Sequence, residues 1–360
     1  MKKILLAATF LLSFVFGAFA QSDLQPLAVV KLNKSETITL KQLKTRIGMG
    51  QKMGDIPATL SIDDKKQILE ALIDQRLVVQ AAQKAGISIT DSQVNQAFLQ
   101  NISQMIGRQV TEAEFASYIK ETTGLSLDDF MKQQVGLSLS EYKAFFKEQI
   151  MTQQYILQQK QSEIAKAVPK DEDIRKFYDL NKASFVQNDL VKVFMVRVPK
   201  NNNADGAKAK GEALLKGITN KSLSYDKVKE DSGNDYQVVD LLIQKTTQNA
   251  QELGIKYDDL IELFGRDVGY ISKLNETDED FQFYAVRKKY AAKMLDIGDL
   301  VQPETTVTVY VYIKQYLSNQ MQSQAYIKAA NDLIKALNTP TNVERKKTGK
   351  DLDKLLSWEK

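Results

Sequence analysis

Between residues 61 and 165 the chain repeats the local signals that begin and end α-helices. A serine or threonine followed three residues later by glutamate or glutamine forms a capping box, in which each residue satisfies a free backbone N–H of the other. Such boxes begin at four positions, the last of them in a weaker form with aspartate: Thr90, Thr111, Ser138 and Ser126. Gly86 stands where a left-handed residue would end the first helix. The segment is therefore predicted to be a set of ordinary helices joined by short loops.

Apolar residues along the first of these helices recur at three- and four-residue spacing, which predicts one buried face. They are Ile68, Leu69, Leu72, Ile73, Leu77, Ala81 and Ala85. Before this helix, residues 28–46 predict a small hairpin that leads into a helix. The Gly- and Met-rich residues 47–56 predict a flexible linker. The region holds no obvious catalytic group, so it favours a binding role.

The first residues, MKKILLAATFLLSFVFGAFAQ, have the pattern of a secretory signal peptide. Lys2 and Lys3 form a basic start, and a short apolar run follows. Cleavage is expected between Ala20 and Gln21, because the apolar run is short for a membrane-spanning helix. Residues 1–20 are expected to be removed, which would leave an exported, periplasmic protein without stable membrane insertion.

The 360-residue chain contains no histidine and no cysteine. The lack of histidine excludes Ser-His-Asp and Cys-His catalysis and histidine zinc sites. The lack of cysteine excludes disulfides and thiolate metal ligands. The formal net charge of +4 includes Lys2 and Lys3, so the mature charge gives no reason to expect nucleic acid as a partner. We expect no metal and no cofactor.

Beyond a boundary expected near residues 165–170, the sequence changes from helical to mixed. Residues 191–198, VKVFMVRV, predict a buried strand. Residues 307–316 alternate valine and tyrosine and predict a second strand. An amphipathic helix is expected around Leu333 and Leu337. This half is therefore predicted to contain an α+β domain.

Two long stretches, AVVKLNKSETITLKQLKTRI and QILEALIDQRLVVQAAQKAGISITDSQVNQAF, resemble the N-terminal domain of SurA-like periplasmic chaperones. VPKDEDIRKFYDLNKASF, residues 168–185, resembles that family's entry into its parvulin domain. The resemblance implies an α-helical SurA-type chaperone domain, discontinuous in sequence, plus an inserted α+β parvulin-like domain. The helical domain would comprise residues 21–168 with 321–360. The parvulin-like domain would comprise residues 169–320, with an insertion near 233–264.

The resemblance also implies where a parvulin pocket would lie, because parvulins carry one histidine on their first strand and one on their last. Met195 and Val311 stand at these two positions here, and neither can hydrogen-bond as histidine does. The degenerate pocket implied in this way comprises Met195, Asp267, Tyr270, Phe281, Tyr310 and Val311. No residue is assigned as catalytic, and core or turn roles are favoured for most of this set.

A chaperone needs an adaptable apolar surface, and methionine is flexible and over-used at promiscuous surfaces. The peptide-binding candidates in the helical half are Met49, Met53, Met105, Met131 and Met151. For each of them, filling a gap in the core is an equally good interpretation.

We therefore expect an exported, ATP-independent chaperone that holds unfolded or extended secreted or outer-membrane polypeptides, with the helical half as the holding surface. Two alternatives stay open. One is an active parvulin-type peptidyl-prolyl cis-trans isomerase with a histidine-free site. The other is a structural or adhesive exported protein. The sequence does not define the oligomeric state.

Overall fold

The computed structural model describes residues 23–201 and 203–358. The expected signal peptide, residues 1–20, and its cleavage site lie outside the described residues. Within the described part of the chain, no helix has the length and apolarity needed to cross a membrane.

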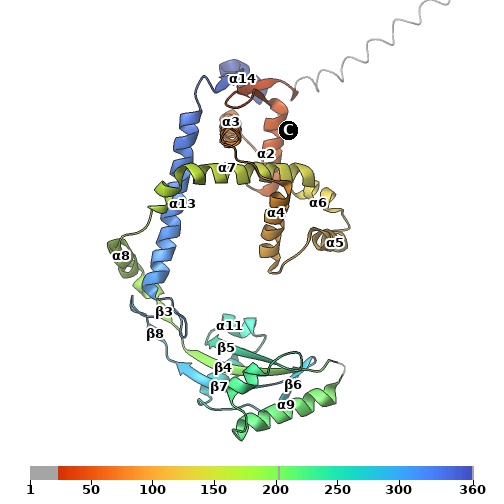
Figure 1. Cartoon of the computed structure of the whole chain (residues 1–360), viewed down its shortest axis with the longest axis vertical. Coiled ribbons are helices and arrows are strands. Elements are labelled where there is room, and N and C mark those ends of the chain that lie inside the picture. Colours follow the sequence, from red (N-terminus) through yellow and green to blue (C-terminus); the bar gives the residue numbers. More distant parts are fainter. Residues whose placement is uncertain (1–22, 202, 359–360) are drawn as a thin grey trace, which may run out of the picture. The chain divides into compact units, whose positions relative to one another are not determined.

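The contacts within the chain divide it into two compact units. The helical unit comprises residues 1–167 and 320–360, and the sheet unit comprises residues 168–319 (Figure 1). Together they give the expected fold class, an α-helical SurA-type part and an inserted α+β parvulin-like part.

The helical unit consists mainly of helices, most of them from the first half of the chain and two from its C-terminal part. They are α2 (Leu40–Met53), α3 (Ile62–Lys84), α4 (Asp91–Ile106), α5 (Glu112–Thr123), α6 (Leu127–Gln134), α7 (Leu139–Ala165), the later part of α13 (Val309–Leu337), and α14 (Gly349–Leu356).

The predicted helix signals of residues 61–165 are confirmed. The hydroxyls of Thr90, Thr111 and Ser138 each accept a hydrogen bond from the backbone N–H three residues on, which completes a capping box. The hydroxyl oxygen of Ser126 accepts from the backbone N–H of Asp129 at 3.1 Å. These starts could be predicted because a cap depends only on residues within one helical turn.

The prediction of a flexible linker at residues 47–56 is wrong. α2 continues to Met53 because Ile47 and Met49 face the core, with 6% and 4% of their surface exposed. The helix ends at Gly54, whose φ of 81° is a left-handed conformation that favours glycine.

Three short strands bring the two ends of the chain together in the helical unit. β1 (Pro26–Val30) pairs antiparallel with β2 (Glu36–Thr39), which confirms the predicted hairpin. On its other side β1 pairs antiparallel with β9 (Val343–Arg345). Val343 of β9 and Leu356 of α14 are buried in the same core as side chains of β1 and α3.

The sheet unit begins with α8 (Asp171–Asn181) and is centred on a four-stranded antiparallel sheet in the order β5-β4-β7-β6. These strands are β4 (Leu190–Pro199), β5 (Gln237–Gln244), β6 (Asn275–Glu276) and β7 (Asp280–Tyr290). The remaining elements are the short helix η1 (Lys182–Ser184), the two-stranded pair β3 (Val186–Gln187) and β8 (Lys293–Met294), and the start of α13. The predicted strand at residues 191–198 is confirmed as β4.

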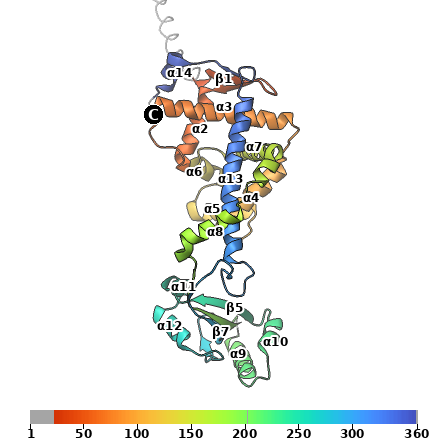
Figure 2. The same ribbon diagram turned by 90° about the vertical axis from the view of Figure 1, so that its left-hand side faces the viewer.

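Helices cover the two faces of this sheet (Figure 2). α9 (Ala204–Thr219) and α10 (Tyr225–Glu230) pack on one face, against a core that includes Phe194 and Val196. α11 (Thr247–Glu252) and α12 (Tyr257–Gly265) pack over one end of the other face. The rest of that second face is open and forms the groove described below.

The predicted strand at residues 307–316 is wrong, because this segment begins α13. Val309 and Ile313 are one helical turn apart and are both fully buried. They pack against Ile174 and Tyr178 of α8. Packing against a neighbouring helix therefore overrides the strand preference of the alternating valines and tyrosines.

Residues 233–264 form β5, α11 and α12, and so they contribute to the core of the sheet unit. Ile243, Ala250 and Leu260 from this segment are buried together with Val191 and Val193 of β4. That the segment is inserted relative to a compact parvulin stays a prediction.

Candidate functional site

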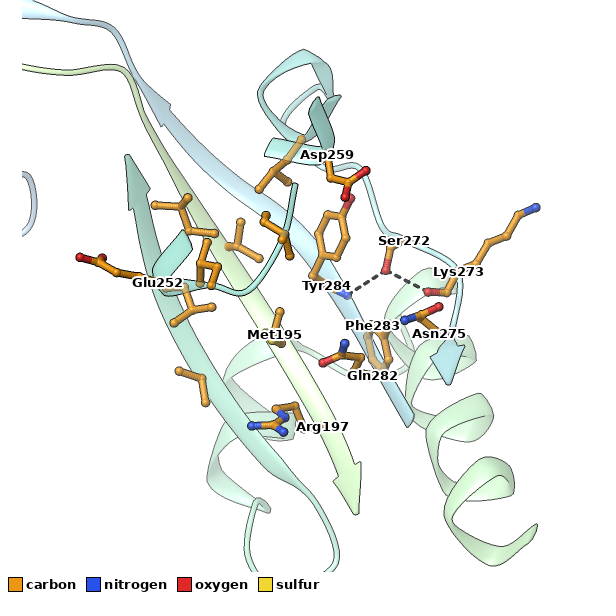
Figure 3. Close-up of a pocket in the computed structure, with 17 residues that line it drawn as sticks. Met195, Arg197, Glu252, Asp259, Ser272, Lys273, Asn275, Gln282, Phe283 and Tyr284 are labelled. Carbon is orange, nitrogen blue, oxygen red and sulfur yellow. Dashed lines mark hydrogen bonds between the residues drawn. The ribbon is translucent and has the colours of Figure 1, made fainter. Parts of the chain in front are cut away.

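An open groove of about 610 Å³ lies on the face of the sheet opposite α9 (Figure 3). Its floor comprises alternate residues of three strands: Val193, Met195 and Arg197 of β4, Val239, Leu241 and Ile243 of β5, and Gln282 and Tyr284 of β7. The residues between them belong mainly to the other face, because successive side chains of a strand alternate. Phe283, which is buried in the core on that face, also contributes to the lining. Leu253, Ile255 and Leu263 line the groove from the α11–α12 side.

Met195 lies at the centre of the floor, since β4 is flanked by β5 and β7. The residue opposite Met195 on β5 is Val239, and the residue opposite it on β7 is Tyr284. The floor is therefore mainly aliphatic, with a flexible thioether in the middle and one phenol beside it.

Hydrogen bonds and ring contacts fix Tyr284. Its backbone N–H donates to the Ser272 hydroxyl at 2.9 Å, and its carbonyl accepts from the Ser272 N–H at 2.8 Å. Its ring packs against that of Tyr270 at 6.0 Å between centroids, and the Arg266 guanidinium lies 4.6 Å from the Tyr270 ring. Burial raises the pKa of the Tyr284 hydroxyl, so this group stays protonated at neutral pH.

The charged groups at the rim are largely neutralised. Arg197 forms an ion pair with Asp280 at 2.7 Å, and Asp280 is only 3% exposed. Asp280 also accepts from the Thr277 hydroxyl at 2.8 Å. The other charged residues on the lining are Lys273, Glu252 and Asp259, so the lining carries charges of both signs without a large excess of either. This arrangement suits an uncharged apolar ligand.

The six residues of the implied parvulin pocket are not brought together. Met195 lines the groove and Tyr270 packs beside it, but Asp267 is exposed in a turn with Gly269, whose φ is 93°. Phe281 is buried on the opposite face, among the residues that pack under α9. Of the six expected residues, Met195 therefore lines the groove and Tyr270 packs against its lining residue Tyr284.

Tyr310 and Val311 lie on α13, and neither lines the groove. Their assignment to the last strand of a parvulin pocket is corrected by the structure, because the strand beside β4 is β7. Tyr284, which was not predicted as a site residue, is the residue of β7 directly opposite Met195. The alternation in DFQFYAVRKKY, residues 280–290, was the available signal.

The methionine candidates of the helical unit fall into two groups. Met49, Met131 and Met151 are buried, with 4–6% of their surface exposed, so these three fill the core. Met53 and Met105 are exposed, at 46% and 76%. Of the five candidates, Met53 and Met105 are thus the two whose side chains are exposed.

A charged contact ties the loop before α13 to the sheet. Glu304, at the tip of this loop, accepts hydrogen bonds from the Nζ atoms of Lys192 and Lys288 and from the Tyr290 hydroxyl. These donors lower the pKa of Glu304 from 4.5 to about 2. A carboxylate with a lowered pKa stabilises the fold above its unfolded pKa and loses that contribution as the pH falls.

We expect Glu304→Gln to lower the melting temperature at pH 6 and to have a diminishing effect below pH 4.5, because Glu304 of the unfolded wild-type chain then takes up a proton while the folded chain does not. Thermal unfolding of both proteins between pH 6 and pH 3 measures this. Asp278→Asn, at an exposed acidic residue, is the control and should change little. A difference between wild type and Glu304→Gln that is constant across this pH range would contradict the prediction.

Comparisons with known proteins agree with this geometry. Residues 169–297 match the family of PPIC-type PPIase domains. A segment of 227 residues is 26% identical to the foldase protein PrsA of Clostridium acetobutylicum, covering 61% of this chain and 62% of that protein. A segment of 192 residues is 26% identical to the chaperone SurA of Pseudomonas putida, covering 50% and 39%. Each match spans less than two thirds of the relative's length.

Among solved structures, one from work on PEB4 and Cj1289, two SurA-like chaperones of Campylobacter jejuni, is 18% identical over 90% of this chain and 99% of that chain, with a TM-score of 0.34. Residues 169–297 are thus similar to PPIC-type, parvulin-like domains. The chain is similar in sequence to the PrsA and SurA proteins.

Proposed function

We propose that this protein is an exported, ATP-independent chaperone that holds unfolded secreted or outer-membrane polypeptides. The observation that carries the proposal is the apolar groove on the sheet, with Met195 at its centre and without histidine in the chain. Similarity to a foldase and to a chaperone supports the same role. The exposed Met53 and Met105 would add contacts from the helical unit.

We further propose that residues 21–168 and 321–360 fold as one chaperone domain, and that residues 169–320 fold as a second. The pairing of β9 with β1 supports the discontinuous domain. So does the burial of Val343 and Leu356 in the core beneath α3.

The apolar area of the groove sets the expected strength of binding. Removing apolar surface from water contributes roughly 25 cal/mol per Å², so burial of about 400 Å² would supply on the order of 10 kcal/mol. Immobilising and ordering an unfolded client offsets most of this free energy. Binding should therefore be weak and reversible, which allows release of the client without ATP.

Light scattering from an unfolded β-barrel polypeptide, diluted from urea, tests the proposed function. We expect the chain from Gln21 onward to suppress scattering at a few-fold molar excess. A folded protein of similar size and charge with no apolar groove is the control. Scattering equal to that of the client alone, with the chain shown to be folded, would refute the holding function.

A prolyl isomerase is the second candidate, because residues 169–297 match the PPIC-type PPIase domain. Isomerisation crosses a barrier of about 18–20 kcal/mol without covalent chemistry, so a groove that favours the twisted amide could catalyse it. Among the hydrogen-bonding side chains of the groove, the protonated Tyr284 hydroxyl belongs to the residue directly opposite Met195 on β7.

We expect isomerisation of a proline tetrapeptide to stay within about tenfold of the uncatalysed rate, since one phenol replaces a histidine pair. A protease-coupled assay measures this rate. A large rate enhancement that is lost in Tyr284→Phe would overturn this prediction and establish the isomerase.

A further inference from the structure

β5 forms one edge of the four-stranded sheet, and its hydrogen bonds show which of its backbone groups are free. The N–H of Lys245, just after β5, donates to the carbonyl of Asp189, just before β4, at 3.0 Å. Backbone groups in an antiparallel pair point inward and outward at alternate residues. The odd-numbered residues of β5 therefore bond to β4, and its even-numbered residues point away from the sheet.

Only the last of these outward-pointing residues is satisfied by the chain itself. The N–H of Gln244 donates to the Asn249 side chain at 2.6 Å, and its carbonyl accepts from the Thr246 N–H at 2.9 Å. Within the described residues, no backbone group pairs with the outward N–H and C=O groups of Val238, Asp240 and Leu242. These three residues present a row of free donors and acceptors.

This edge lacks the features that usually prevent pairing with another chain, namely proline, bulges and free charges. β5 contains no proline, and its register with β4 is regular from Gln237 to Gln244. Its one charged residue, Asp240, forms an ion pair with Lys229. Val239 is 37% exposed although it faces the groove.

The free edge continues directly into the groove. Val239, Leu241 and Ile243 of β5 line the groove, so a strand added beside β5 would place every second side chain along the same apolar face. Its other side chains would lie on the far side of the sheet, where Asp240 is exposed. The groove lining carries charges of both signs, so net charge selects no particular segment. Backbone pairing with β5 and the alternation of apolar and polar side chains would select the segment that binds.

We propose that an extended polypeptide segment of alternating apolar and polar residues binds as an added antiparallel strand on the free edge of β5. This inference rests on the proposed holding function and names its substrate class. Alternation with period two is the pattern of strands that form β-barrels. A second copy of this chain fits less well, because pairing the free residues Val238–Leu242 of two antiparallel β5 strands would place Asp240 opposite Asp240, and opposed like charges destabilise a strand pair.

The first experiment leaves the protein unchanged. The probe is a fluorescein-labelled octapeptide with apolar residues at every second position, and its binding to the chain from Gln21 onward is followed by anisotropy. N-methylation of the polar positions removes the amides that would face β5, and we expect it to weaken binding at least tenfold. N-methylation of the apolar positions should change binding less than threefold. Equal effects of the two modifications would overturn the proposal.

The second experiment changes the edge. Leu242→Pro removes an outward N–H without removing a bond to β4, which an edge strand tolerates. We expect Leu242→Pro to weaken binding of the unmodified octapeptide at least tenfold, and Leu242→Ala, which keeps the N–H, to weaken it less than threefold. Equal affinities of two folded variants would overturn the proposal. If Leu242→Pro does not fold, the comparison of the two N-methylated peptides still tests the proposed strand pairing.

The outcomes separate this inference from the proposed function. If the unaltered chain fails to suppress client aggregation, the holding function is wrong. If it suppresses aggregation but neither N-methylation nor Leu242→Pro matters, only the strand pairing is wrong. A doubled sedimentation mass that Leu242→Pro abolishes would assign the edge to a second copy and overturn the proposal.

Discussion

A chain that ends at residue 320 is expected to lose the cooperative unfolding of its helical unit. The deletion removes β9, which pairs with β1, together with the buried side chains of Val343 and Leu356. Full burial of one such side chain contributes about 1.5–3 kcal/mol. Several partly buried residues of the same core are removed with them: Leu337, Leu352, Leu355 and Trp358. The loss is therefore comparable with the whole stability of a typical domain, about 5–15 kcal/mol.

Urea unfolding followed by far-ultraviolet circular dichroism measures this effect. Leu356→Ala is a milder version and should cost about 2–5 kcal/mol, because it leaves a cavity in the core. Lys350→Ala, at an exposed residue of the same helix, is the matched control and should stay within about 0.5 kcal/mol of wild type. If the truncated chain unfolds like the full chain, the proposal of a discontinuous domain is wrong.

Placing a charge on the floor of the groove should abolish client binding. In Met195→Glu a carboxylate replaces the thioether between Val239 and Tyr284. An apolar client side chain that covers this carboxylate would strip it of water without supplying a partner, which costs several kcal/mol. We expect peptide affinity to fall more than tenfold and suppression of client aggregation to be lost.

Met195→Leu is the matched control, because it conserves volume and apolarity. It should bind the same peptide within about twofold, since the loss of thioether flexibility is a small change. Binding by isothermal calorimetry and melting temperatures for both variants separate loss of the site from loss of the fold. Unchanged client binding by a folded Met195→Glu protein would move the holding site elsewhere, with the exposed Met53 and Met105 as the next candidates.

Local signals explain most of what could be predicted from the sequence. The caps at Thr90, Thr111 and Ser138 involve residues within one helical turn, so these helix starts could be predicted from short sequence patterns. β4 was predicted because most residues of VKVFMVRV are apolar and four of them are β-branched valines. Met195 was placed in a pocket by the resemblance to parvulins, because it stands where they carry a histidine on their first strand.

The failures concern contacts between distant residues. Residues 307–316 have strand-forming side chains, but Val309 and Ile313 are buried against α8, a helix more than a hundred residues earlier. Tyr284 was missed because the pairing of β7 with β4 joins segments that no local pattern links. The burial of Met49 depends likewise on packing that its own neighbourhood does not reveal.

The pairing of β1 with β9 also determines when the protein can finish folding. Ala28 on β1 is opposite Arg345 on β9, so nearly the whole chain must be made before this pair can form. Contacts between residues so far apart in sequence form slowly, because a long loop must close first. The residues of the sheet unit are contiguous, so this unit can fold before β9 is available to the helical unit. During that interval the core around β1 stays incomplete, and the chain itself exposes apolar surface that the folded protein buries.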